Sequence, residues 1–265
     1  MIDFLIVIYK NYDLMYYQSE HFARLYEAYF QNNFRRTYRL IFIDNTPLEF
    51  RKSVNHDLLT ENCHVFINDN QDNTHDGASQ GAAIDFGRQY CSSPIVCVMD
   101  SDFIFTSYIP IDGHSILNEF KEDLNLNAIG TEYYDGESDV EYAWKNIVSK
   151  NKGLFENIPC CFCMFLKQDL LNSHTWKVTH EESLLKSNTF IETGWRIRNH
   201  ILEYRLKTKT WTGYQLDNAL GTESPSYFNY GENLIGFHLQ RGSHRNSESS
   251  VPTIHSLLKK YYLEN

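Results

Sequence analysis

VCVMDSDF, at positions 96–103, is an apolar run that ends in two aspartates one residue apart. The turn residues of Ser92–Pro94 precede the run, which is typical of a fully buried strand. Burying unpaired carboxylates is costly, and a divalent cation at the end of the strand removes that cost. Mg²⁺ and Mn²⁺ prefer oxygen ligands and commonly complete their shell with substrate phosphates. Asp100 and Asp102 therefore indicate a metal site for a phosphorylated substrate, with a capped or solvated turn as the alternative.

The chain on either side of this motif alternates apolar runs with amphipathic segments. Before residue 110 the pattern predicts strands at 4–9, 40–43, 63–67 and 95–99, and helices at 14–31 and 77–90. This order predicts an α/β fold with a mostly parallel central sheet flanked by helices. In such sheets ligands bind beyond the carboxyl ends of the strands. Those ends carry Asn11, Asp44, Asp100 and Asp102.

The second half of the chain is less regular. It predicts strands at 158–166 and 234–239 and helices at 195–206 and 254–263. We find no internal repeat, low-complexity tract or linker, so we expect a single domain over residues 1–265.

Composition narrows the class of protein. A formal net charge of -10 argues against general nucleic-acid binding, which needs a dense basic surface. No basic segment precedes the first predicted strand, so we expect a cytoplasmic protein with no secretory signal. The six cysteines lie mostly within apolar runs, and their spacing suggests neither a disulfide framework nor a zinc site, so we expect buried, reduced thiols.

Taken together, these features resemble the GT-A-type nucleotide-sugar glycosyltransferases, most closely family 2. A polar turn follows the first strand, and Asp44-Asn45 follows the second, as the family's acid does. A Gly- and Ala-rich helix at 77–87 precedes the strand that leads to Asp100-Ser101-Asp102, which is similar to the family's DxD motif. Glu192-Thr193-Gly194-Trp195 is similar to the acidic motif that begins the acceptor-side helix. The chain departs from the family at Thr46-Pro47 and Ile84-Asp85.

The resemblance implies a GT-A-like (Rossmann-like) domain with a nucleotide-sugar-binding half at 1–110 and an acceptor-binding half at 111–265. Asp102 and the late His238 would bind Mn²⁺ or Mg²⁺, although His238 is equally well explained as a core histidine. The remaining donor-side candidates are Asp100 at the ribose or the metal's water shell, Asp44 at the base or ribose, Tyr9 and Asn11 around the base, Gln80 near the ribose, and Arg241 and Arg245 at the diphosphate.

On the acceptor side, Glu192 is the candidate general base that removes the proton of the acceptor hydroxyl. The alternative is an acid that complements the dipole at a helix start. Trp195 is a candidate platform for an acceptor sugar, and core packing is the alternative.

The predicted function is metal-dependent transfer of a sugar from a nucleotide-sugar to a glycan or lipid-linked acceptor, with inversion, in surface-glycan (polysaccharide) biosynthesis. The basic segment at Lys259 and Lys260 either touches the inner face of a membrane or is a solvated helix end. Two alternatives stay open: a sugar nucleotidyltransferase, disfavoured because no glycine follows the first strand, and a non-catalytic nucleotide- or glycan-binding protein of the same fold. A P-loop enzyme is excluded because no G-x-x-x-x-G-K-[ST] run occurs.

Overall fold

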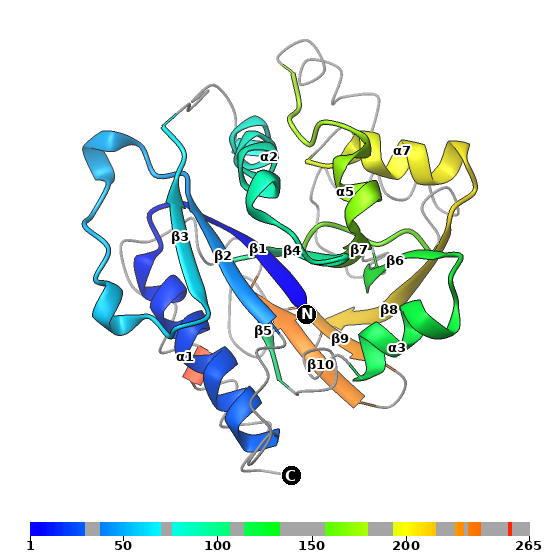
Figure 1. Ribbon diagram of the computed structural model, residues 1–265, viewed down its shortest axis with the longest axis horizontal. Helices are drawn as coiled ribbons and strands as arrows, with labels where there is room; N and C mark the ends of the chain where they lie inside the picture. Colours follow the sequence, from blue (N-terminus) through cyan, green and yellow to red (C-terminus); the bar gives the residue numbers. More distant parts are fainter. Residues whose placement is uncertain are drawn as a thin grey trace.

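A single ten-stranded sheet forms the centre of the molecule (Figure 1). The computed structural model describes residues 1–29, 38–69, 76–106, 114–132, 157–179, 193–215, 226–230, 233–239 and 254–255. The strands are β1 (Ile2–Ile8), β2 (Tyr38–Asp44), β3 (Cys63–Ile67), β4 (Ile95–Asp100), β5 (Phe103–Phe105), β6 (Leu126–Thr131), β7 (Cys163–Lys167), β8 (Lys207–Gln215), β9 (Ser226–Tyr230) and β10 (Asn233–His238). Their order across the sheet is β3-β2-β1-β4-β7-β6-β8-β9-β10-β5.

Seven of these strands, from β3 to β8 in that order, form a mostly parallel region. β3, β2, β1 and β4 run parallel to one another, β7 runs antiparallel between β4 and β6, and β6 pairs in parallel with β8. The expected α/β class and mostly parallel central sheet are therefore confirmed. The other three strands, β9, β10 and β5, extend the sheet in antiparallel pairings.

Helices cover both faces of the sheet (Figure 1). One face carries α1 (Tyr12–Tyr29) and α3 (His114–Glu122), and the other carries α2 (Asp76–Gly87), α5 (Gln168–Ser173) and α7 (Trp195–Glu203). Successive side chains of a strand point to opposite faces of the sheet, so each face has its own core. Phe4 and Ile6 of β1 pack in one core, and Leu5 packs in the other. Short 3₁₀ turns at Leu48–Phe50, His56–Leu58 and Arg88–Tyr90 complete the described elements.

Some predicted boundaries change. The strand predicted at 158–166 begins only at Cys163, because Pro159 has no N–H to donate and the N–H of Cys160 bonds to the carbonyl of Thr131 at 2.7 Å. The polar strand β8 shows no apolar run, so the sequence did not reveal it. Of the helix predicted at 254–263, only residues 254–255 are described. All six cysteines are free, and all but Cys63 are buried.

The carboxyl ends of the central parallel strands meet at one edge. Ile8 of β1 lies beside Asp44 of β2, and Val7 lies beside Asp100 of β4. After Asp100 the chain turns immediately into β5, yet β5 pairs with β10 at the far end of the sheet order. The antiparallel end of the sheet therefore curls back toward the end of β4 (Figure 1). Within the described residues, no helix is both long and apolar enough to span a membrane.

Candidate metal centre

The two aspartates of the motif stand on either side of the turn between β4 and β5. Asp100 is the last residue of β4, and its N–H donates to the carbonyl of Phe162 at 3.0 Å. Asp102 is buried, and its carbonyl accepts the N–H of Leu239 at 3.2 Å. The turn is therefore tied to the loop before β7 on one side and to the end of β10 on the other.

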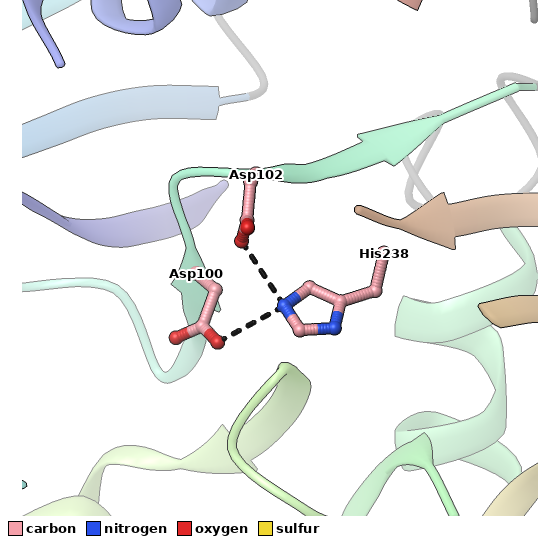
Figure 2. Close-up of side chains that lie close together, drawn as sticks. All are labelled: Asp100, Asp102 and His238. Atoms are coloured by element: carbon pink, nitrogen blue, oxygen red, sulfur yellow. Dashed lines mark ion pairs between the residues drawn. The ribbon is translucent and has the colours of Figure 1, made fainter. Parts of the chain in front are cut away.

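His238, the last residue of β10, completes the cluster. It lies opposite Phe103 in the pairing of β10 with β5, and its ring stacks on Phe162 with the ring centroids 4.3 Å apart. Figure 2 shows the imidazole pointing between the two carboxylates. Its Nε2 lies 3.0 Å from Oδ1 of Asp102 and 3.3 Å from Oδ2 of Asp100. The buried His238 therefore has both carboxylates as partners, an arrangement that fits the predicted metal ligand as well as the alternative, a core histidine with satisfied hydrogen bonds.

The electrostatics of this cluster favour a positive charge at its centre. Burial alone would lower the pKa of His238, but the charges and hydrogen bonds of Asp102 and Asp100 outweigh it and raise that pKa to about 10. At Asp100 burial acts in the opposite direction and raises the pKa of the carboxyl, although its hydrogen bond to His238 opposes this shift. Two carboxylates in a largely buried position thus produce a negative field that attracts cations.

The donor set fits a divalent metal ion. One ligand atom from each of the three residues lies within 4.8 Å of the others. Adjacent donors of an octahedral ion bound at about 2.1 Å stand about 3.0 Å apart, close to the observed separations from Nε2. Carboxylate oxygens suit both Mg²⁺ and Mn²⁺, and the imidazole nitrogen favours Mn²⁺ of the two. Among the described residues this is the one group of three or more such side chains arranged to hold an ion.

A second polar cluster lies at the same edge, beyond β1 and β2. The Asp44 carboxylate is buried and accepts the Tyr12 hydroxyl at 2.8 Å and the N–H of Thr46 at 3.0 Å. The N–H of Lys10 donates to the hydroxyl of Thr46 at 2.9 Å, with Lys10 in the left-handed region at φ 64°. Tyr9 is partly exposed beside them. This edge therefore combines a fixed carboxylate with an accessible aromatic ring.

The structure brings some of the predicted site residues together. Asp100, Asp102 and His238 form one cluster, and Gln80 joins it by donating to Oδ1 of Asp100 at 2.6 Å. Asp44, Tyr9 and Asn11 lie at the neighbouring strand ends, and Trp195 begins α7. Glu192, Arg241 and Arg245 lie outside the described residues, so their predicted roles remain predictions.

Sequence reasoning missed two residues that support the site. Gln18 lies on the buried face of α1 and donates to the carbonyl of Ser101, within the motif turn, at 3.1 Å. Tyr12 holds Asp44. A signal for Gln18 exists in the sequence, because a glutamine on the apolar face of a helix needs a buried hydrogen-bond partner.

No family model matches the sequence, and the comparison with curated proteins found no match. Solved structures do share part of the fold. A mannosyltransferase, PcManGT of Pyrobaculum calidifontis, in complex with GDP-Man and Mn²⁺, is 11% identical over 65% of this chain and 46% of its own, with a TM-score of 0.37. The galactosyltransferase LgtC with donor and acceptor sugar analogues is 13% identical over 76% of this chain and 70% of its own, with a TM-score of 0.46.

A third solved structure, the mannosyl-3-phosphoglycerate synthase of Rubrobacter xylanophilus, is 10% identical over 92% of this chain and 89% of its own, with a TM-score of 0.45. These are limited likenesses of fold, and this chain spans less than half the length of the first of the three proteins.

Proposed function

We propose that this protein is a metal-dependent glycosyltransferase that moves a sugar from a nucleotide-sugar donor to a glycan or lipid-linked acceptor, with inversion. The observation that carries the proposal is the convergence of Asp100, Asp102 and His238 at the carboxyl edge of a parallel sheet, where α/β folds bind nucleotides. The neighbouring cluster of Asp44 and Tyr9 supports it, because a nucleoside needs polar and aromatic contacts within reach of its phosphates.

In this proposal each side chain of the metal centre has a defined part. Asp102 and His238 hold Mn²⁺ or Mg²⁺, and Asp100 binds the metal's water shell or the donor ribose. When bound, the divalent ion supplies Lewis-acid neutralisation of the charge on the departing diphosphate. Arg241 and Arg245, which follow β10 in sequence, contact the diphosphate oxygens through their guanidinium groups.

The nucleoside lies over the ends of β1 and β2. Tyr9 stacks on the base, Asn11 and Asp44 fix its orientation, and Gln80 stands between the ribose and Asp100. The acceptor approaches from the α7 side, where Trp195 packs against a sugar face. Glu192 takes the proton from the acceptor hydroxyl as it attacks the anomeric carbon, which inverts the configuration.

Thermal unfolding with UDP, GDP, dTDP and CMP, each with and without Mn²⁺, tests the donor site. A ligand at 100 times its dissociation constant stabilises the folded state by about 2.7 kcal/mol, which raises the melting temperature by about 5 °C in a chain of this size. We expect one nucleotide to give this shift only with Mn²⁺ and only in the wild type, not in Asp102→Ala. If Asp102→Ala responds as the wild type does, the metal assignment is wrong.

Glycosyl transfer itself is tested at Glu192. We expect Glu192→Gln to abolish transfer from the donor identified above while the metal-dependent thermal shift with its nucleotide stays unchanged. Loss of both readouts would assign Glu192 a structural role. Retention of transfer would remove it as the general base.

A further inference from the structure

The free edge of β5 is satisfied by side chains of α1 instead of by another strand. β5 pairs with β10 on one side. On the other side, Nε2 of Gln18 donates to the carbonyls of Ser101 at 3.1 Å and Phe103 at 2.7 Å. One helical turn later, Nε2 of His21 donates to the carbonyl of Phe105 at 2.6 Å. The three carbonyls belong to every second residue of the chain, so they point to the same side of β5. On that side α1 occupies the place of a neighbouring strand.

The two bonds of Gln18 hold the backbone on both sides of Asp102. Its acceptors are the carbonyls of the residues immediately before and after Asp102, and the Gln18 side chain is fully buried. A buried amide with two good acceptors has little freedom to move, because breaking either bond leaves a carbonyl without a partner in the core. Gln18 thus fixes the backbone that carries Asp102.

Gln80 of α2 acts in the same way on the side chain of Asp100. Its Nε2 donates to Oδ1 of Asp100 at 2.6 Å, while Oδ2 of the same carboxylate lies 3.3 Å from His238. The carboxylate is therefore oriented with one oxygen on the helix amide and the other toward the centre of the cluster. Two helices on opposite faces of the sheet each contribute one glutamine (Figure 1).

We propose that Gln18 and Gln80 are positioning residues, which hold the two carboxylates in their ion-binding arrangement before the ion arrives. The inference rests on the proposed metal centre. His238 lies between the two carboxylates, but it does not fix the backbone around Asp102 or the second oxygen of Asp100, which the two glutamines do. Hydrogen-bonding partners behind metal ligands typically contribute a factor of about 10 to 100 in metal affinity. Gln80 thereby gains a role that does not depend on a bound ribose.

Titration with Mn²⁺ alone, followed by the electron paramagnetic resonance signal of the free ion, tests the inference. Gln18→Met and Gln80→Met keep the length of the side chain and remove its donor. We expect each to weaken Mn²⁺ binding by about 10-fold or more. His21→Leu is the matched control, because it removes a bond of the same kind from the same face of α1 to a carbonyl farther from Asp102. We expect His21→Leu to lower the free energy of unfolding and to leave Mn²⁺ affinity within about 2-fold of the wild type.

The outcomes separate positioning from general stability. Wild-type Mn²⁺ affinity in both glutamine variants overturns the inference, and so does a loss in His21→Leu equal to theirs. If Gln18→Met does not fold, the Gln80→Met titration decides alone, since Gln80 is only partly buried. Wild-type and Asp102→Ala titrations run alongside them. Failure of the wild type to bind Mn²⁺, or unchanged binding in Asp102→Ala, overturns the metal centre itself and this inference with it.

Discussion

Gly194, at the start of α7, is a position where a single methyl group should be costly. It has a left-handed backbone with φ +73°. A Cβ built there would lie 2.7 Å from Cζ3 and 2.8 Å from Cε3 of Trp176. Trp176 is fully buried, and its indole N–H donates to the carbonyl of Leu171 at 3.0 Å, so the ring has no simple way to move aside.

The expected cost of Gly194→Ala has two parts. The left-handed conformation costs a non-glycine residue about 1–2 kcal/mol. Forcing a methyl group against a fixed ring costs about 1–3 kcal/mol more. We therefore expect the free energy of unfolding to fall by about 2–5 kcal/mol. Urea denaturation followed by far-ultraviolet circular dichroism measures it, provided that the slope of the transition is the same in both proteins.

A second background separates the two parts. Trp176→Phe removes the part of the indole that contains Cζ3 and Cε3, so Gly194→Ala in that background should cost only the conformational part, about 1–2 kcal/mol. A change below about 0.5 kcal/mol for Gly194→Ala in the wild type would refute the reasoning altogether. An equal cost in both backgrounds would refute the contact with Trp176.

Three further predictions concern the ends of β1, β2 and β10. Asp3→Asn should lower the free energy of unfolding at pH 7 by about 1.5–3 kcal/mol, because the buried Asp3 accepts two bonds from the partly exposed Arg39 at 2.8 and 2.7 Å. Burial acts to raise the pKa of Asp3, but Arg39 and two backbone N–H groups lower it overall. The stabilisation is therefore present above the pKa of the unfolded state and is lost as the pH falls through the pKa of the folded state. If the urea midpoints of the wild type and Asp3→Asn differ as much at pH 3 as at pH 7, this prediction is wrong. Tyr12→Phe should cost about 1.5–3 kcal/mol in urea denaturation through the lost bond to Asp44, and no change would mean that this bond is dispensable. His238→Ala should weaken Mn²⁺ binding by at least about 10-fold in a direct titration, and wild-type affinity would remove His238 from the metal centre.

The sequence predicts the four adjacent parallel strands β3, β2, β1 and β4, because a local apolar run marks each of them. The run 95–99 is continuously apolar and flanked by turn residues, and the structure extends it by one residue to Asp100. Asp100 and Asp102 could be identified as candidate site residues because they come directly after that run, where unpaired carboxylates are costly to bury. A strand that is buried on both faces of the sheet can be recognised from sequence, because its residues form a continuous apolar run.

The remaining strands are not predictable in this way because the information that specifies them is non-local. β8, with the sequence KTKTWTGYQ, resembles a surface segment, and only its pairing with β6 and β9 identifies it as a strand. Nothing in the sequence near Phe103 shows that β5 pairs with β10, so the position of His238 between the aspartates could be expected only from the family resemblance. The contact of Gln18 with the motif turn likewise depends on how α1 packs.

The pairing of β5 with β10 has a consequence for the order of events when the protein is made. Thr106, just after β5, donates its hydroxyl to the carbonyl of Leu234 in β10, and these residues are 128 positions apart. A ribosome therefore releases the Asp-x-Asp motif long before the strand that carries His238 has been translated. The three-residue donor set cannot form in the nascent chain until β10 has been translated, because the two aspartates precede His238 by more than 100 positions. During refolding, high contact order makes such long-range pairings late events. Assembly of the proposed metal centre should consequently be a late event in folding, when the antiparallel end of the sheet closes.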